Sequence, residues 1–398
     1  MRSLVAPTAY KGTLSPVQAA QVIATNLVGE ADLCPIADGG TGWLEVWAYH
    51  FPDAQRHTVV AHDALLQPRR AEWLLLPSGA AVVESAQAIG IHLLAWESLA
   101  PLQASSQGVG EMLAAAAAHP DTRALLLGLG GVATTDAGAG ALHALGFRLL
   151  DRSGNTIFAN YPLREVPPAS RRNQGAVPLA KRGEPSGGGK GLPDVPSLLL
   201  GLHAIEPPAA DPLHGKPLTL CADVQNTLLD AARVYAPQKG ATPEQVATLV
   251  RALERFAEVA LRDTGIDLTA TVGAGAAGGL AGGLHAYTRA PIVSGIMWLL
   301  RHVDWQARLY AADCLIIGEG QVDAQTLMGK GVGVLIQQAV ALGKPVVVLA
   351  GRKGAGWEPL ARLPRVQVYA CTEVAPDLPP EEALAQTTRE AFSRNTTA

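Results

Sequence analysis

The stretch from Cys314 to Gly331 carries the densest set of reactive side chains in this chain. An apolar run of strand length ends at Gly318-Glu319-Gly320, which we interpret as a turn, and a helix is expected to open near Gly329-Lys330. Open α/β sheets bind ligands just outside the carboxyl ends of their strands. Carboxylates there can hold a divalent cation and a lysine can meet an anion, so the pattern predicts phosphoryl transfer. The polar side chains concerned are Glu319, Asp323, Gln325, Thr326 and Lys330.

Two glycine-rich segments are also expected to join a strand to a helix. One runs from Gly128 through Gly130, Gly131, Thr134 and Asp136, and the other, from Gly273 to Gly278, matches GxGxxG. Backbone N–H groups at such helix starts can bind an anion, although threonine capping and tight glycine packing explain the same patterns. Together with the first stretch they favour an anionic ligand.

Two common nucleotide signatures are missing. No Gly-Lys pair is followed by Ser or Thr, so the chain is not a P-loop protein. The glycine motif also lacks the acidic residue expected about twenty positions on, because the next acid after Asp267 is Asp304. A nicotinamide-dependent oxidoreductase is therefore disfavoured.

Further charged residues follow other predicted strands. Lys11-Gly12 follows the first strand, Asp38-Gly39-Gly40 the second, and Asp223 comes after Leu218–Ala222. Each could be a lone solvated charge, yet all occupy the strand end at which α/β enzymes collect their chemistry.

The elements that must position these groups alternate between strand and helix. We expect strands at 3–6, near 33–36, and at 124–127, 218–222, 345–349 and 366–369. One helix is expected to start at Ser15-Pro16, a second to carry Trp43 and Trp47 as core residues, and a third to lie near 292–300. An amphipathic helix capped by Thr242 is expected over 243–262. From about His57 the pattern changes to an antiparallel meander over 58–62, 71–76 and 81–84.

Composition excludes several classes of protein. The 398 residues are 48% hydrophobic and 17% charged, which fits folded cores and a prior of two domains. A net charge of −4 argues against a nucleic-acid binder. The N-terminus is no signal peptide, and the uncharged stretch 268–288 holds too many glycines for a membrane helix. Four scattered cysteines indicate a reduced, cytoplasmic setting.

Residues 152–217 hold eleven of the 28 prolines and a Gly/Ser-rich core. Such a composition buries too little apolar surface to offset its ordering entropy, so we expect a flexible surface insertion, centred on about 165–197.

Read in order, these motifs resemble the bacterial glycerate kinases of the glyoxylate and glucarate pathways. The matching stretches are Ala6-Pro7 with Tyr10-Lys11-Gly12, Pro35–Gly40, Gly130–Gly140, Cys221–Asn226, Pro237–Thr242, Gly273–Leu280 and Gly318–Thr326. The resemblance runs from about residue 4 to about residue 350.

The resemblance implies two α/β domains: a Rossmann-like domain of residues 1–56 and 290–398, and an inserted α/β domain of residues 57–289. It implies ATP- and Mg²⁺-dependent phosphorylation of D-glycerate, with 2-phosphoglycerate favoured as product. Partners would be ATP and a small hydroxy acid, and a homo-oligomer stays open. Neither a nucleic acid nor a membrane is expected as a partner.

The resemblance also implies roles for residues. Glu319 and Asp323 would hold Mg²⁺ or polarise the acceptor, Asp38 would act as general base or second metal contact, and Lys11 and Lys330 would neutralise phosphate or carboxylate oxygens. The other substrate- or nucleotide-binding candidates are Gly130, Gly131, Thr134, Asp136, Asp223, Asn226, Lys239, Gly275, Gly278, Gln321, Gln325 and Thr326.

Several positions depart from the family pattern. Thr8, Thr41 and Val132 differ from it, and Gln321 stands where the family has an arginine. Arginine gives an anion two parallel charged hydrogen bonds that glutamine cannot give. A kinase for another small hydroxy acid, and a non-catalytic ligand-binding descendant, therefore remain as alternatives.

Overall fold

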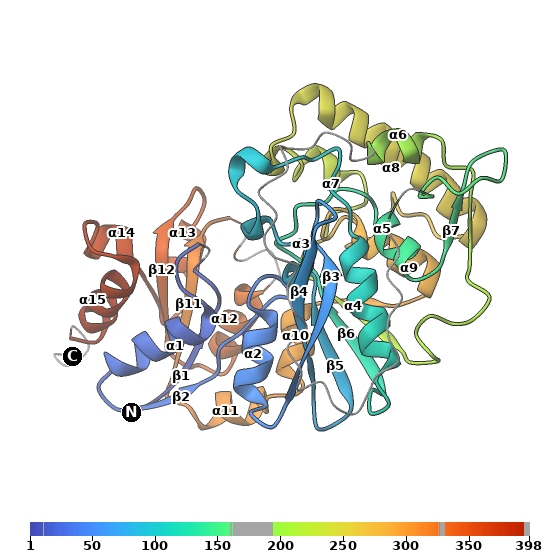
Figure 1. The fold of residues 1–398 in the computed structure, drawn as a ribbon. Helices are drawn as coiled ribbons and strands as arrows, with labels where there is room; N and C mark the ends of the chain where they lie inside the picture. Colours follow the sequence, from blue (N-terminus) through green and yellow to red (C-terminus); the bar gives the residue numbers. More distant parts are fainter. Residues whose placement is uncertain (11, 160, 162–193, 325, 327–330, 394–398) are drawn as a thin grey trace. The chain divides into compact units, whose positions relative to one another are not determined.

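The structure is a computed structural model that describes residues 1–10, 12–159, 161, 194–324, 326 and 331–393. It divides into two compact units (Figure 1). The first comprises Met1–Pro52 and Ser294–Ala398, so it is built from both chain ends, and the second comprises Asp53–Val293.

The first unit is built on a five-stranded sheet in which every neighbouring pair is parallel. Its strand order is β13-β12-β11-β1-β2. The strands are β1 (Arg2–Pro7), β2 (Glu30–Leu33), β11 (Cys314–Val322), β12 (Val346–Lys353) and β13 (Val366–Ala370). Their carboxyl ends therefore lie at one edge of the sheet, as the strand-end argument requires.

Helices bury the apolar residues of this sheet. The helices of the unit are α1 (Pro16–Thr25), α2 (Trp43–His50), α10 (Gly295–Leu300), α11 (Trp305–Ala311), α12 (Val332–Ala341), α13 (Glu358–Ala361), α14 (Cys371–Val374) and α15 (Pro380–Ser393). One core cluster joins Val5, Ile316 and Leu349 of the strands to Ile23 of α1 and Leu384 of α15. Such strands read as continuous apolar runs because a parallel sheet is covered on both faces.

Local sequence rules explain several helix starts. Ser15 is the N-cap of α1, as its Ser-Pro sequence predicted, and the structure adds a capping box with Gln18. Trp43 and Trp47 are fully buried, which confirms them as core residues. The helix predicted near 292–300 begins later, at Gly295, because the Ser294 side chain accepts from the Met297 N–H. The second strand ends at Leu33 rather than Ile36.

The predicted Gly-Glu-Gly turn is wrong, because β11 continues through it to Val322. Pairing with β1 ends at Pro7 and Gly318, whereas pairing with β12 goes on through Glu319 to Val322. Glycine allows the close approach: a Cβ atom at Gly351 would lie 2.5 Å from the Gly320 carbonyl oxygen. The motif therefore stands on a two-stranded extension beyond the end of β1, which we call the β11–β12 extension (residues 319–322 and 350–353).

The second unit has a mixed six-stranded sheet of order β10-β9-β6-β5-β4-β3. Its strands are β3 (Gln55–His62), β4 (Pro68–Leu75), β5 (Ala80–Glu84), β6 (Ala124–Gly128), β9 (Leu218–Cys221) and β10 (Ile292–Val293). The antiparallel pairs β3–β4 and β4–β5 confirm the predicted meander. The strands β5, β6, β9 and β10 are parallel and send their carboxyl ends to one edge.

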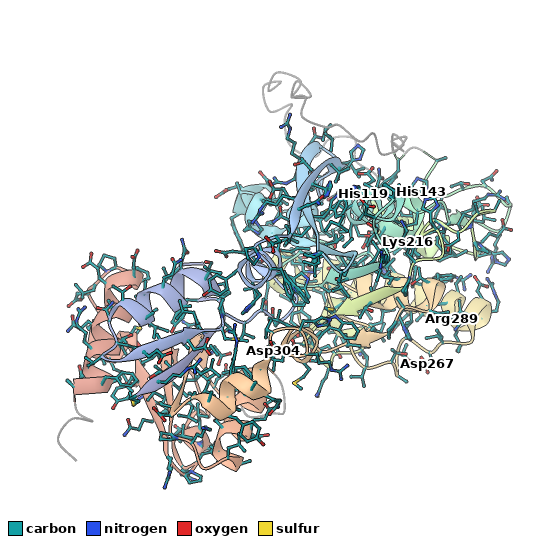
Figure 2. All side chains as sticks on the ribbon, turned by 90° about the horizontal axis from the view of Figure 1, so that it is seen from below. His119, His143, Lys216, Asp267, Arg289 and Asp304 are labelled. Carbon is teal, nitrogen blue, oxygen red and sulfur yellow. The ribbon has the colours of Figure 1, made fainter. Side chains whose placement is uncertain are left out.

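The helices of this unit pack into one large core with the sheet. They are α3 (Ala86–Ile89), α4 (Gln107–Ala118), α5 (Ala139–Ala144), α6 (Val195–Leu200), α7 (Asp230–Arg233), α8 (Pro243–Thr264) and α9 (Leu280–Thr288). The N-cap of α8 is Thr242, as predicted, in a capping box with Gln245. Before β9, the Lys216 ammonium donates to the Ala117 and His119 carbonyls, which ties this strand to the end of α4 (Figure 2).

Part of the predicted flexible insertion is packed. Residues 162–193 lie outside the described residues, but Val195, Leu199, Leu202 and Ile205 are buried. The short sheet of β7 (Arg148–Leu150) and β8 (Ala204–Glu206) lies beside α8. The prediction is wrong for this part because composition over a long window hides a short apolar helix.

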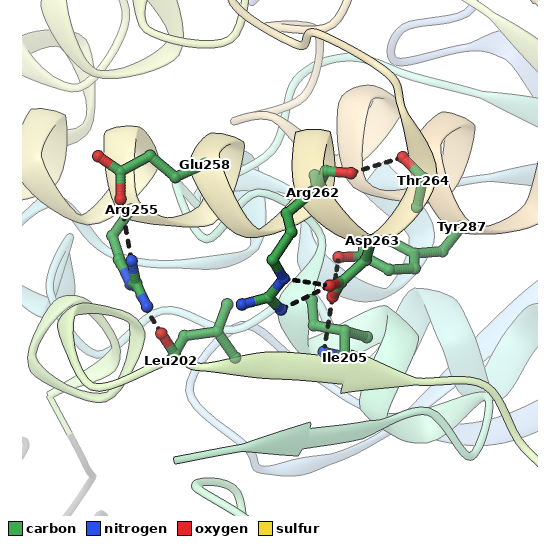
Figure 3. A network of polar contacts seen from close by, with 9 residues as sticks. Leu202, Ile205, Arg255, Glu258, Arg262, Asp263, Thr264 and Tyr287 are labelled. Carbon is green, nitrogen blue, oxygen red and sulfur yellow. Dashed lines mark hydrogen bonds and ion pairs between the residues drawn. The ribbon is translucent and has the colours of Figure 1, made fainter. Parts of the chain in front are cut away.

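Side chains of α8 hold this packed segment. Arg255 donates to the Leu202 carbonyl at 2.7 Å, and the Asp263 carboxylate accepts from the Ile205 N–H at 3.0 Å (Figure 3). Among the described residues, no helix combines the length and the apolar character needed to cross a membrane.

Candidate active site

The β11–β12 extension gathers four of the predicted site residues into one hydrogen-bonded group. Gln321 Nε2 donates to Asp323 Oδ2 at 2.8 Å. The Asp323 N–H donates to Thr326 Oγ1 at 3.1 Å, and Thr326 Oγ1 in turn donates to Glu319 Oε2 at 3.5 Å. Thr326 is buried, whereas Glu319, Gln321 and Asp323 are half-buried. We call these four residues the acidic group.

Glycine at the end of β12 makes room for the acidic group. A Cβ atom at Gly354 would lie 2.6 Å from Gln321 Nε2 and 3.0 Å from the Asp323 Cβ atom. The Gly354 N–H also donates to the Val322 carbonyl at 2.7 Å, and the Ala324 N–H donates to the Ala355 carbonyl at 3.1 Å. The turn after β11 is therefore held by main-chain bonds to the residues that follow β12.

The loop after β1 is hydrogen-bonded to the main chain of β11 and β12 next to the acidic group. The Thr8 N–H and hydroxyl both donate to the Gly318 carbonyl, at 2.7 and 3.1 Å. The buried Tyr10 hydroxyl donates to the Leu349 carbonyl at 2.6 Å. Burial raises the pKa of Tyr10, and the nearby Cys371 and Glu319 raise it further. Sequence reasoning did not select Tyr10, although its place just before Lys11 in the first motif was a usable signal.

Asp38 is exposed in the loop after β2, at the edge of the sheet that also carries Glu319. Its Oδ1 accepts from the Gly40 N–H at 2.9 Å. Its backbone packs against the start of α10, where a Cβ atom at Gly295 would lie 2.3 Å from the Asp38 carbonyl oxygen. Within the described part of the chain, no hydrogen bond joins Asp38 to the acidic group. Lys11, Gln325 and Lys330, also predicted here, lie outside the described residues.

The donor set of the acidic group fits Mg²⁺. This ion is commonly bound by one or two carboxylates, with waters and substrate phosphates completing its octahedron. Glu319 and Asp323 supply two carboxylates: the Thr326 hydroxyl donates to the first, and the Gln321 amide donates to the second. In the residues the structure describes, no group of three or more His, Cys, Asp or Glu side chains could hold a metal ion. Waters and substrate phosphates would therefore have to complete the coordination of Mg²⁺.

In the second unit, Asp136 is a fully buried anchor. Its carboxylate accepts from the Ser106 N–H and hydroxyl, both at 2.8 Å, and from the N–H groups of Gly138 at 3.1 Å and Gly140 at 3.2 Å. Burial raises the pKa of Asp136, while these hydrogen bonds oppose the rise. Sequence reasoning did not select Ser106, which is the N-cap residue of α4.

Lys239 is also buried, and it holds the neighbouring turn. Its ammonium donates to the Thr134 carbonyl at 2.5 Å and lies 3.4 Å from Thr135 Oγ1. Burial lowers the pKa of Lys239 to about 8, and the charge of Asp136 acts in the opposite direction. The Thr134 hydroxyl has no hydrogen-bond partner among the described residues. Thr134, Asp136 and Lys239 thus come together inside the unit.

The two glycine-rich turns of this unit interlock. A Cβ atom at Gly278 would lie 1.9 Å from the Thr134 carbonyl oxygen, and one at Gly275 would lie 2.3 Å from the Thr227 carbonyl oxygen. The Ala137 N–H donates to the Gly278 carbonyl at 3.1 Å. Ala137 and Gly278 both have left-handed backbones, with φ of 53° and 70°. Of the two explanations left open for these glycines, tight packing accounts for Gly275 and Gly278 directly.

The remaining candidates lie at strand ends of the same sheet. Gly130 and Gly131 follow β6, and the Gly130 N–H is 3.4 Å from the Ser85 hydroxyl. Asp223 and Asn226 follow β9. Asn226 accepts from the Tyr235 hydroxyl at 2.8 Å through its side chain and from the Gly275 N–H at 3.0 Å through its carbonyl. These bonds fix the loop after β9 against the second glycine turn.

Comparison with known proteins agrees with this architecture. The model of the glycerate kinase family matches residues 3–168 and 186–397. A protein named glycerate kinase from Halalkalibacterium halodurans is 33% identical over 370 residues, covering 89% of this chain and 86% of that protein. A protein named glycerate 2-kinase from Escherichia coli is 31% identical over 361 residues, covering 88% and 85%.

A solved structure gives the same result for the fold. The crystal structure described as a candidate glycerate kinase 2 from Salmonella typhimurium LT2 superposes with a TM-score of 0.72 at 27% identity. The match covers 100% of this chain and 98% of that one. The chain is therefore an enzyme of the kinase class, and it belongs to the glycerate kinase family.

Proposed function

We propose that this protein transfers the γ-phosphoryl group of ATP to D-glycerate in a Mg²⁺-dependent reaction, with the 2-hydroxyl as acceptor. The observation that carries the proposal is the acidic group at the end of β11, in a chain of the glycerate kinase family. The relative named glycerate 2-kinase supports the choice of hydroxyl.

The chain's own residues would position and neutralise rather than form covalent intermediates. Bound Mg²⁺ would offset the charge that develops on the transferring phosphoryl oxygens. Glu319 and Asp323 would hold it, with Gln321 and Thr326 orienting the two carboxylates through the hydrogen bonds described.

Asp38 is the proposed general base. It is exposed at the same sheet edge and can accept the proton of the acceptor hydroxyl as the oxygen attacks phosphorus. The new bond joins that oxygen to the phosphoryl group, the bond to ADP breaks, and ADP leaves with the electron pair. Lys11 and Lys330 remain proposed partners for phosphate or carboxylate oxygens.

In the second unit, Gly130, Gly131, Asp223 and Asn226 are the proposed ligand contacts. Thr134, Asp136, Lys239, Gly275 and Gly278 make internal contacts instead, so we propose that they hold these turns in shape.

Product analysis tests the regiochemistry of the proposal. Purified protein incubated with ATP, Mg²⁺ and D-glycerate should yield a phosphorus resonance coupled to the C2 proton in ³¹P–¹H correlation spectra. Coupling to the C3 protons would contradict 2-phosphorylation. The same assay on a panel of small hydroxy acids separates D-glycerate from the alternative substrates, because preference for another acid would reject D-glycerate.

A further inference from the structure

Arg352 of β12 lies directly beside Gln321 of β11. The two residues are register partners in the parallel β11–β12 pair, and Glu319 is likewise paired with Ala350. Register partners on strands about 4.8 Å apart point to the same face, and residues two apart on a strand share that face. The Arg352 side chain therefore points to the face that carries Glu319 and Gln321, and it is exposed there.

The Arg352 side chain is available to bind a ligand. It makes no ion pair and no hydrogen bond with any residue in the described part of the chain. Its neighbour Lys353, which alternates to the other face, behaves differently: it donates to Glu373 Oε2 at 2.7 Å and lies 4.1 Å from the Trp357 ring centroid. Gly351 and Gly354, which are close to Arg352 in the sequence, have no side chains that could cover it.

The surroundings of Arg352 call for a cation. Glu319 and Asp323 are acidic, and the Gln321 amide donates its hydrogen bond to Asp323. The proposed Mg²⁺ would neutralise these two carboxylates but would leave no net positive charge there for a further anionic group of the ligand. A guanidinium suits that task because it offers two parallel donors to a carboxylate or a phosphate.

We propose that Arg352 binds an anionic oxygen group of the ligand, and so supplies positive charge from β12 beside the neutral Gln321 of β11. This proposal rests on the phosphotransferase function proposed above. The anionic group is either the carboxylate of the acceptor acid or a phosphate of the nucleotide, which share the same chemistry.

The variant Arg352→Gln tests the proposal, with Arg362→Gln as matched control. Arg362 is an exposed arginine of the same unit, on the connection that leads to the amino end of β13, away from the acidic group. We expect R352Q to lower kcat/KM by about 10- to 100-fold through loss of a charged hydrogen bond, and R362Q to change it by less than about twofold.

Two KM values separate the sources of the anion. A rise in the KM for D-glycerate assigns Arg352 to the carboxylate, and a rise in the KM for ATP assigns it to a phosphate. Either rise supports the proposal when the melting temperature of R352Q equals that of the wild type, as expected for substitution of an exposed side chain. Wild-type kcat/KM for both ligands in R352Q would overturn it.

The exchange variant Gln321→Arg/Arg352→Gln moves the charge from β12 to β11. We expect it to recover most of the kcat/KM that R352Q loses, a result that a merely structural role for Arg352 does not give. If the exchange variant lost as much kcat/KM as R352Q does, the charge argument would be contradicted. Calorimetric binding of MgATP and of D-glycerate needs no turnover, so it tests Arg352 even if the wild type fails to phosphorylate D-glycerate.

Discussion

Carboxylates that looked alike in the sequence differ in their surroundings. Asp136 is fully buried and accepts four hydrogen bonds from its own unit. Glu319 and Asp323 are half-buried at the end of a strand. A group that binds a ligand must be accessible as well as charged, so catalysis is expected to depend on Glu319 and Asp323 rather than on Asp136.

The variant Asp323→Asn tests this difference. It keeps a side-chain oxygen for the Gln321 amide but removes the negative charge proposed to hold Mg²⁺. We expect the Mg²⁺ concentration for half-maximal activity to rise by at least about 10-fold, because even groups that only orient metal ligands cost this much. A titration of activity against Mg²⁺ measures it.

Asp377→Asn is the matched control, since Asp377 is exposed in a loop of the same unit. An unchanged Mg²⁺ requirement in D323N, or an equal rise in D377N, would contradict the assignment of Asp323.

Lys239 predicts a pH dependence of stability. Its pKa is about 8 in the folded protein and about 10.5 in the unfolded chain. Between these values the unfolded state binds more protons than the folded state, so this group makes the free energy of unfolding rise with pH from about 8 to about 10.5.

The variant Lys239→Met removes the titrating group. Subtracting its free energy of unfolding from that of the wild type, in urea titrations at pH 7.5 and pH 10, should give a difference that grows with pH. A difference that stays flat or falls over this range would show that the ammonium is not buried as described.

At the scale of elements, glycine decides how closely the turns of the second unit approach. Gly278→Ala brings a Cβ atom within 1.9 Å of the Thr134 carbonyl oxygen and forces a left-handed backbone. We expect a loss of roughly 3–4 kcal/mol in the free energy of unfolding: about 1 for the backbone and the rest for the displaced turn.

Gly265→Ala provides the control. Gly265 ends α8 with a similar φ of 76°, and a Cβ atom there meets nothing within 4 Å. Denaturant titration should show a cost of about 1 kcal/mol for G265A. Equal losses in the two variants would mean that the turns do not interlock.

Elements were predictable where local rules govern them. Ser15 and Thr242 cap their helices by side-chain hydrogen bonds that span three residues, so the sequence alone shows them. The extension of β11 past Gly318 was not predictable, because it depends on pairing with residues 31 positions away, such as Ala350 with Glu319. The anchoring of Asp136 by Ser106 was missed for the same reason.

At the scale of the whole molecule, fold class and family were predictable from ordered motifs, while the side-chain partners within the site were not. Alternating strands and helices with polar strand ends indicated an α/β fold, and the family match confirms it. The neutral Gln321 suggested a missing charge; only the register of β11 with β12 shows that Arg352 stands beside it.

Ligand binding should be visible in the stability of the whole chain. A ligand that binds only the folded state adds about 2.7 kcal/mol when present at 100 times its dissociation constant. We therefore expect MgATP to raise the melting temperature of the wild type, and to raise that of D323N less at the same concentration. Equal shifts in both proteins would speak against Asp323 as a magnesium ligand.

The most direct test of the central claim is ADP release by the purified wild-type protein, followed in a coupled assay with ATP and Mg²⁺. The account predicts release that depends on D-glycerate, exceeds the rate with L-glycerate, and matches the phosphoglycerate formed. Folded protein that releases no ADP in response to D-glycerate would contradict it.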